Sequence, residues 1–155
     1  MEKRSQSPIK LISLIKACCI LLTFAACSSN DAPAEKETAI SYRAIYKSDT
    51  ATLHGKFTGK AFYGQMEVNY NGAYKDSGEV NGIIKGDSLL GTFHFQHYGI
   101  EQWHRIPIAL LKKDRKLIMG VGEMEVKMNM TFFKKNVPID YEHVKFVFEK
   151  IPAAN

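Results

Sequence analysis

Cysteine is scarce in this chain and is confined to its first part. The 155 residues contain three cysteines, Cys18, Cys19 and Cys27, so no thiol is available after residue 27. We therefore expect the folded domain to contain neither a disulfide bond nor a cysteine-ligated metal. Its stability must come from a hydrophobic core, which a segment of about 115 residues is long enough to form.

Long hydrophobic runs are also missing. The most apolar stretch, residues 17–26, is bounded on its N-terminal side by Lys16. A helix that spans a membrane needs roughly 20 apolar residues, and this stretch is much shorter. We therefore expect no permanent transmembrane helix.

Sequence signatures of enzymes and of nucleic-acid binding are absent as well. The chain has no phosphate-binding loop, no metal-ligand spacing and no nucleophile elbow. Its net charge of +5 includes +3 from residues 1–26, which leaves +2 for the remainder. We therefore expect a protein that is not an enzyme, uses no cofactor or metal and binds no nucleic acid.

Cys27 is the most informative residue that is present. A basic start precedes the apolar stretch, and Ala25 and Ala26 stand directly before Cys27. This arrangement resembles the lipobox of a bacterial lipoprotein signal, with Phe24 in place of the usual aliphatic residue. The resemblance implies attachment of diacylglycerol to the Cys27 thiol through a thioether, followed by cleavage before Cys27.

The same resemblance divides the chain into segments. Residues 1–26 are then the signal peptide, and residues 27–38 are the lipidated cysteine with a polar, flexible tether. Ser28 stands where an inner-membrane retention signal would place Asp, which favours a lipid-anchored position at the outer membrane of the cell envelope. An ordinary secretory signal is the alternative, and it would give a secreted or periplasmic protein.

From residue 39 to residue 152 the pattern changes to short alternating runs separated by Gly, Asn, Asp and Ser. Met66, Val68 and Tyr70, for example, alternate with the polar residues between them. Alternation with a period of two is typical of strands that have one buried face. The polar residues 71–77 are expected to form a loop.

The middle of the chain predicts strand register. If residues 86–87 form a two-residue hairpin loop, Val80 faces Phe93. If residues 99–100 form the next tight loop, Phe93 faces Ile106. Both turns place apolar side chains on the same face, and a slip of one residue would reverse a whole strand. The agreement of the two turns therefore supports both registers.

A third turn near residues 113–114 is expected to bring Leu117, Met119 and Val121 onto that face and to set Glu123 opposite His104. Gly120 and Gly122 would then mark a bulge.

Further wall strands are expected beyond that point. Met124, Val126, Met128 and Met130 have the alternation of a strand face, which favours core packing over a copper(I) site. Residues 143–151 complete the pattern as a final strand.

These elements predict an all-β domain of about eight antiparallel strands over residues 39–152. Closure into an up-and-down barrel, as in the lipocalins, would remove the exposed edges of such a sheet. A two-sheet β-sandwich is the alternative.

A family resemblance supports this fold. The stretch 78–93, with the sequence GEVNGIIKGDSLLGTF, resembles a hairpin of small lipoproteins from Bacteroidota-type bacteria, and residues 110–113 and 119–123 continue the resemblance. The shared motif consists of turns and strand faces. The resemblance therefore implies a lipocalin-like barrel in the envelope but supplies no catalytic site, and lipocalin-like ligand binding is an analogy of fold alone.

Four residues near the turn at 99–100 form the predicted ligand site. Phe95, His97 and His104 are expected to point into the barrel, with Gln102 beside them. An apolar wall with a few convergent polar groups is the usual composition of a small-molecule pocket. The alternative is a barrel mouth at which polar residues meet water.

The opposite face of the same hairpin carries a second feature. The predicted register sets Trp103 beside Gln96 and Arg105 beside His94, with Tyr98 nearby. This aromatic and basic patch is a candidate surface for a partner or a carbohydrate, or it simply covers the sheet.

Two functions remain open for a membrane-anchored, non-catalytic protein. An empty barrel would bind a small apolar ligand, whereas a filled barrel would belong to a structural lipoprotein or to one that contacts another envelope protein. Gly55, Gly64, Gly82 and Gly91 either leave room inside or let phenylalanine rings fill it. An interior cavity of about 300 Å³ or more would favour the ligand binder.

Overall fold

The structure, a computed structural model, describes residues 38–98 and 100–152. Every regular element in this part of the chain is a β-strand, because short runs of β-branched and aromatic residues alternate with polar ones. The predicted all-β class is confirmed. The strands are β1 (Thr38–Tyr46), β2 (Asp49–Phe57), β3 (Ala61–Tyr70), β4 (Tyr74–Lys85), β5 (Ser88–His97), β6 (Trp103–Lys113), β7 (Lys116–Met119), β8 (Met124–Lys127), β9 (Met130–Phe133) and β10 (Val147–Ile151).

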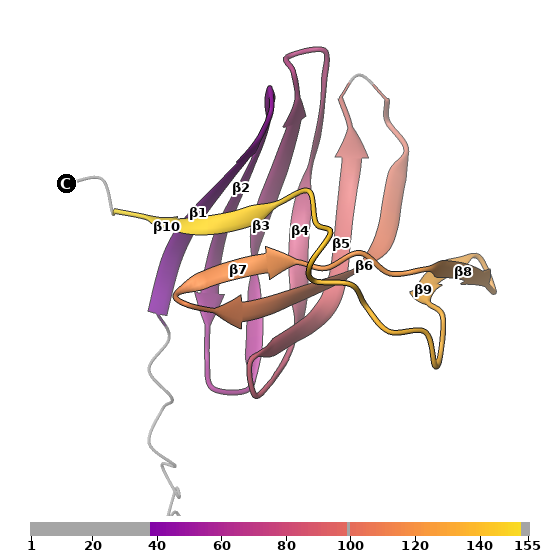
Figure 1. Ribbon diagram of the computed structural model, residues 1–155. Coiled ribbons are helices and arrows are strands. Elements are labelled where there is room, and N and C mark those ends of the chain that lie inside the picture. Colours follow the sequence, from indigo (N-terminus) through magenta and orange to yellow (C-terminus); the bar gives the residue numbers. More distant parts are fainter. Residues whose placement is uncertain (1–37, 99, 153–155) are drawn as a thin grey trace, which may run out of the picture. The chain divides into compact units, whose positions relative to one another are not determined.

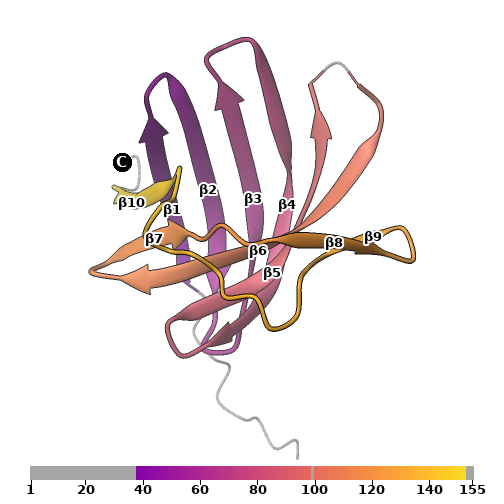
Figure 2. The same ribbon diagram turned by 45° about the vertical axis from the view of Figure 1, so that its right-hand side comes forward.

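Eight of these strands form one closed antiparallel barrel (Figure 1). Their order around the wall is β1, β10, β7, β6, β5, β4, β3 and β2. β10 and β7 complete the wall between β1 and β6 (Figure 2). The predicted eight-stranded up-and-down barrel is confirmed, and the closed wall excludes the β-sandwich alternative.

The two predicted registers are confirmed as well. Val80 lies opposite Phe93 across β4 and β5, and Phe93 lies opposite Ile106 across β5 and β6. Gly86 has a φ of 59°, which suits the first position of a tight hairpin turn. The turn at Gly86 thus accounts for the pairing of β4 with β5. The predicted two-residue loop at 99–100 is instead a longer connection, residues 98–102, which keeps the predicted register of β5 and β6.

Side chains from around the closed wall form one buried hydrophobic cluster in the barrel interior. Inward residues alternate with outward ones along each strand, as the period of two predicts. The cluster of buried residues consists of Tyr42, Ala44, Ala51, Leu53, Phe62, Met66, Val68, Val80, Leu89, Phe93, Ile108, Leu110, Leu117, Phe146 and Phe148.

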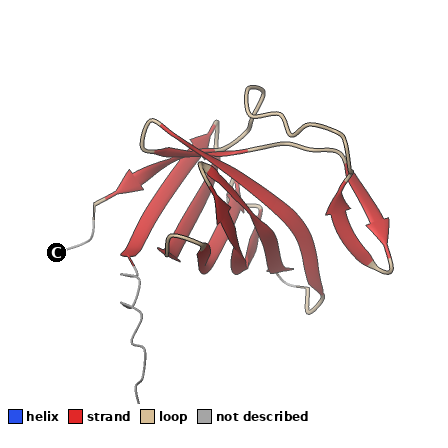
Figure 3. Ribbon diagram, turned by 90° about the horizontal axis from the view of Figure 1, so that it is seen from below, coloured by secondary structure: helices blue, strands red, loops and turns tan. Residues whose placement is uncertain are grey.

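The chain between Met119 and Phe146 leaves the barrel wall, so the predicted wall strand at 124–130 is wrong. The Met119 N–H donates to the Phe146 carbonyl at 3.0 Å, and β10 takes the place beside β7. The excluded segment forms the separate β8–β9 hairpin, which projects to one side of the barrel (Figures 1 and 3). Alternation assigns faces to a strand but does not select its neighbour.

The predicted core positions in this segment are wrong for the same reason. Val121 is 53% exposed, and the side chains of the hairpin are exposed in turn: Met124 44%, Val126 71%, Met128 93% and Met130 47%. Met124 pairs with Phe133 and Met130 pairs with Lys127, so these two methionines lie on opposite faces of the hairpin.

Gly120 and Gly122 mark no bulge in a wall strand, because β7 ends at Met119. They instead admit neighbouring side chains. A Cβ added at Gly120 would come to 2.5 Å from Ile139, and one at Gly122 would come to 2.7 Å from the Phe133 ring.

The proposed signal peptide (1–26) and Cys27 lie outside the described residues, as does the tether except for Thr38. β1 begins at Thr38, one residue before the predicted start of the domain. Within the part of the chain that the structure describes, no helix is long and apolar enough to cross a membrane.

Candidate functional site

One end of the barrel gathers aromatic, histidine and carboxylate side chains. Phe95 packs against the core cluster, and its ring lies 5.5 Å from the ring of His104, its partner across β5 and β6. On the other side, the Phe95 ring stacks on Phe93 with centroids 4.6 Å apart. Phe95 and His104 therefore point inward, as the sequence predicts.

His97 is held by a carboxylate on the neighbouring strand. Asp76 lies opposite His97 across β4 and β5, and its Oδ1 accepts a hydrogen bond from His97 Nδ1 at 2.5 Å. A carboxylate can only accept, so Nδ1 carries the hydrogen. The Asp76 Oδ2 accepts a second hydrogen bond, from the Tyr70 hydroxyl at 3.1 Å. Asp76 is 9% exposed, and these two donors compensate for its burial.

Tyr70 is the most strongly perturbed titratable group at this end. Burial raises the pKa of Tyr70 far above its ordinary value, and the adjacent Asp76 charge and hydrogen bond raise it further. The Tyr74 ring stacks on Tyr70 at 4.5 Å between centroids and lies 4.7 Å from His97. The hydroxyl of Tyr70 is thus kept protonated as a donor to Asp76.

Lys145 extends the cluster from the segment that precedes β10. Its Nζ lies 2.6 Å from the Asp49 carboxylate and 4.8 Å from the centroid of the Tyr70 ring. The cation is also 5.1 Å from the Phe146 ring. These contacts link the start of β2 and the end of β3 to the segment that precedes β10.

Gln102 does not join the other three predicted site residues. It is exposed and lies in the connection before β6. The structure thus brings Phe95 together with His104, and attaches His97 to Asp76.

Sequence reasoning missed Asp76, because the polar run 71–77 was predicted to be a loop, and so it also missed the contact of Asp76 with Tyr70. β4 in fact begins at Tyr74. The signal for Asp76 was nevertheless present: the register that sets Val80 opposite Phe93 also sets Asp76 opposite His97.

The predicted pairing of Glu123 with His104 is wrong. β6 and β7 pair with Lys113 opposite Lys116, a shift of two residues from the predicted register, and β7 ends before Glu123. Glu123 instead lies 2.6 Å from the Lys134 Nζ, and this hydrogen bond and charge lower the pKa of the Glu123 carboxyl.

Phenylalanine rings occupy the space beside two of the strand glycines. A Cβ added at Gly82 would come to 2.6 Å from the Phe62 ring, and one at Gly55 would come to 3.1 Å from the Phe57 ring. The rings that occupy this space come from β2 and β3. The glycine positions therefore favour the filled barrel over the ligand-binding one.

The chemistry available at the barrel end is that of an oriented imidazole. A carboxylate–imidazole pair can position a general base, but a nucleophile must lie within reach of it. No serine or threonine hydroxyl hydrogen-bonds to His97 in the described part of the chain. The described residues also contain no group of three His, Cys, Asp or Glu side chains that is arranged to hold a metal ion.

The outer aromatic patch has the predicted arrangement. Trp103 pairs with Gln96, and Arg105 pairs with His94. The Trp103 ring lies 4.6 Å from the His94 ring and is 53% exposed, so it is supported from one side and open to solvent.

Comparison of the chain with protein-family models, curated proteins and solved structures gave no match.

Proposed function

We propose that this chain is a membrane-anchored, non-catalytic lipoprotein of the cell envelope that acts by binding another envelope protein. The barrel is then a filled scaffold, and binding takes place on its outside. The observation that carries this proposal is the β8–β9 hairpin, which exposes apolar side chains beside the barrel.

The hairpin has the composition of an interface. Met124 and Val126 stand on one of its faces and Met130 and Phe132 on the other, and each of these residues is at least 42% exposed. Met128, at the turn, is 93% exposed. Methionine and aromatic residues are enriched in the cores of protein interfaces, and methionine adapts to irregular surfaces. Exposed apolar groups collected on one element favour a partner protein.

Anchoring rests on the sequence around Cys27. A basic start, a short apolar stretch and small residues directly before Cys27 support lipidation at that thiol. Several acyl chains at one residue would hold the protein stably at a membrane. The tether would then keep the barrel close to other proteins of that membrane.

A small apolar ligand inside the barrel is the less favoured function. The buried cluster lies in the interior, and Asp76, Tyr70 and Lys145 are joined by contacts at the end where the ligand site was predicted. A ligand would have to displace these contacts or stop at Phe95 and His104.

Site-specific photo-crosslinking in cells tests the proposal directly. A photoreactive residue at Met128 of the full-length protein should give one discrete adduct, whose partner mass spectrometry identifies. The same residue at Asp87, in an exposed turn of the barrel, is the matched control and should not give that adduct. The substitution Val126→Asp should abolish the Met128 adduct.

Three outcomes would contradict the proposed function. These are the absence of an adduct at Met128, the same adducts at Met128 and Asp87, and an adduct that contains only a second copy of this chain.

A further inference from the structure

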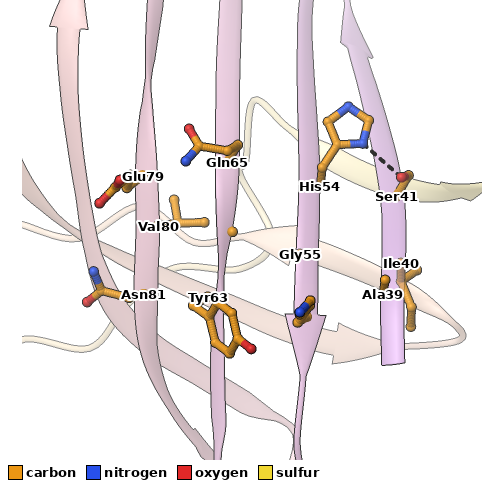
Figure 4. A pocket seen from close by; sticks show the side chains of 12 residues that line it. Ala39, Ile40, Ser41, His54, Gly55, Tyr63, Gln65, Glu79, Val80 and Asn81 are labelled. Atoms are coloured by element: carbon orange, nitrogen blue, oxygen red, sulfur yellow. Dashed lines mark hydrogen bonds between the residues drawn. The ribbon is translucent and has the colours of Figure 1, made fainter. Parts of the chain in front are cut away.

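The outer face of β1–β4 contains a groove with a volume of about 700 Å³ (Figure 4). Its polar lining comes from neighbouring strands and includes His54, Tyr63, Gln65, Glu79 and Asn81. His54 is fixed there by a hydrogen bond of 2.8 Å between its Nδ1 and Ser41 Oγ, drawn as a dashed line in Figure 4. Most of its accessible lining is apolar, so the groove combines an apolar surface with several polar groups on the outside of the barrel.

A second groove of about 620 Å³ adjoins the first on the outer face of β3–β6. Gln65 and Glu79 line both grooves, so the two adjoin each other on the sheet. The lining of the second groove includes Tyr98 and Trp103, which are 73% and 53% exposed. We call the two adjoining grooves the channel; Tyr63 lies in the first groove and Trp103 in the second.

Glycines explain why the outside of this sheet is concave. A Cβ added at Gly64 would collide with the backbone of His54, and one at Gly78 would collide with the backbone of His94. Glycine in a strand permits such a close approach of the neighbouring backbone and a sharp bend at a barrel corner. Gly64 lines the first groove and Gly78 lines the second, so the close approach of the strands at the channel depends on these two glycines.

The charges along the channel exclude a strongly charged ligand. Lys56 and Lys75 are balanced by Glu79 and Glu101 in its lining. A polyanion would instead need an excess of basic side chains. The amides, the carboxylates and the histidine can donate and accept hydrogen bonds in the directions that hydroxyl groups require.

The two aromatic side chains of the channel suit an extended ligand with apolar faces. Tyr63 on β3 and Trp103 on β6 are three strands apart. Across the sheet, Trp103 pairs with Gln96, Gln96 with Ser77, and Ser77 with Glu67. Glu67 is four residues from Tyr63 along β3. From strand spacing and rise, the separation is about 20 Å. Both rings are partly exposed, Tyr63 by 41% beside the Lys56 cation and Trp103 by 53%, and the polar groups between them offer hydrogen bonds.

From these observations we infer that the channel binds a neutral oligosaccharide, whose sugar rings lie against Trp103 and Tyr63 and whose hydroxyls bond to Gln65, Glu79 and Asn81. Sugars combine uncharged hydroxyls at their edges with apolar C–H faces, which matches this lining. The site goes beyond the proposed protein partner, because it lies on β1–β6 and not on the β8–β9 hairpin.

The single tryptophan of the chain makes the site measurable, since Trp103 lines the channel. The probes are hexasaccharides of β-1,4-linked N-acetylglucosamine, β-1,4-linked glucose and α-1,4-linked glucose, with the matching disaccharides. The full-length protein is titrated in a sugar-free zwitterionic detergent. At least one hexasaccharide should shift the Trp103 emission saturably, and should bind at least about tenfold more tightly than its disaccharide.

Variants separate this site from the hairpin. Calorimetry should show that Trp103→Ala and Gln65→Ala each weaken hexasaccharide binding at least about tenfold, whereas the control Phe132→Ala on β9 leaves it unchanged. Matching thermal unfolding of the variants verifies the fold. If no probe binds, if hexasaccharide and disaccharide bind equally, or if Trp103→Ala binds as the wild type does, the inference is wrong. None of these results affects the crosslink expected at Met128.

Discussion

His97 Nδ1 lies 2.5 Å from Asp76 Oδ1 across β4 and β5, at the end of the barrel where three connections meet. The same carboxylate accepts the Tyr70 hydroxyl, so one buried acceptor joins three parts of the wall. A buried carboxylate is stable only while its donors remain in place. This relationship makes the barrel end an ordered part of the fold and leads to the first two predictions.

Asp76→Ala should destabilise the fold by about 1–3 kcal/mol, because the Tyr70 hydroxyl and the His97 ring both lose their acceptor. Urea unfolding measures the change. In a double-mutant cycle, Asp76→Ala and His97→Ala should show a coupling of at least about 0.5 kcal/mol. Additive effects of the two changes would mean that the contact contributes nothing.

The raised pKa of Tyr70 predicts a loss of stability at alkaline pH. Burial, with the Asp76 charge and hydrogen bond, keeps Tyr70 protonated in the folded state, whereas in the unfolded state it ionises near pH 10. The contribution of Tyr70 is therefore fully present below pH 10 and is lost as the pH rises above that value.

Urea unfolding of the wild type and of Tyr70→Phe between pH 8 and pH 11 measures this effect. The variant should be about 0.5–1.5 kcal/mol less stable at pH 8, because it lacks the hydrogen bond to Asp76. Above pH 10 the difference in unfolding free energy between the wild type and the variant should become smaller. The pKa values of Tyr42 and Tyr141 are also raised, but they act equally in both proteins. Parallel profiles would contradict the assignment.

Phe93→Ala should cost about 3–5 kcal/mol, because it leaves a cavity in the buried cluster between Val80 and Ile106. Lys85→Ala, on the exposed side of the same hairpin, is the control and should change stability by less than about 0.5 kcal/mol. Denaturant unfolding of both variants measures the two changes. Equal losses of unfolding free energy would contradict a sheet with one buried apolar face and one exposed face.

Cys27→Ser should release the protein from the membrane fraction, because the proposed lipid attachment needs the thiol. Several acyl chains hold a protein stably, whereas a non-acylated tether does not. Cell fractionation, with mass spectrometry of the N-terminal peptide, measures both anchoring and acylation. Cys19→Ser, within the proposed signal peptide, should leave both unchanged; a soluble wild-type protein would refute the anchor.

The barrel interior should bind no apolar probe. Because the buried cluster fills it, titration of the wild type with an environment-sensitive hydrophobic dye should show no saturable binding. Phe95→Trp should then only overpack the core, with a loss of about 1–3 kcal/mol. Saturable binding that Phe95→Trp abolishes would restore the ligand-binding function at the barrel end.

The sequence predicted the strands of the central wall and their register, because both depend on local chemistry. Gly86 specifies a tight turn, and alternation then assigns Phe93 and Ile106 to the same face as Val80. The inward direction of Phe95 and His104 followed from that register. The same reasoning would have found Asp76 if β4 had been extended to Tyr74, but a polar run reads as a loop unless its partner strand is known.

Tertiary structure alone decided where the wall closes. Met119 bonds to Phe146 because β10 lies along the side of β7 that is not paired with β6. No local sequence pattern around Met119 predicts a partner so distant in sequence. Because β10 pairs with β7, the segment after Met119 lies outside the barrel wall, and Val126 and Met128 are exposed. Their alternation in sequence would fit a strand of the barrel core just as well as this exposed hairpin. The concave outer channel likewise arises from the bending of paired strands, which glycines permit but only barrel closure imposes.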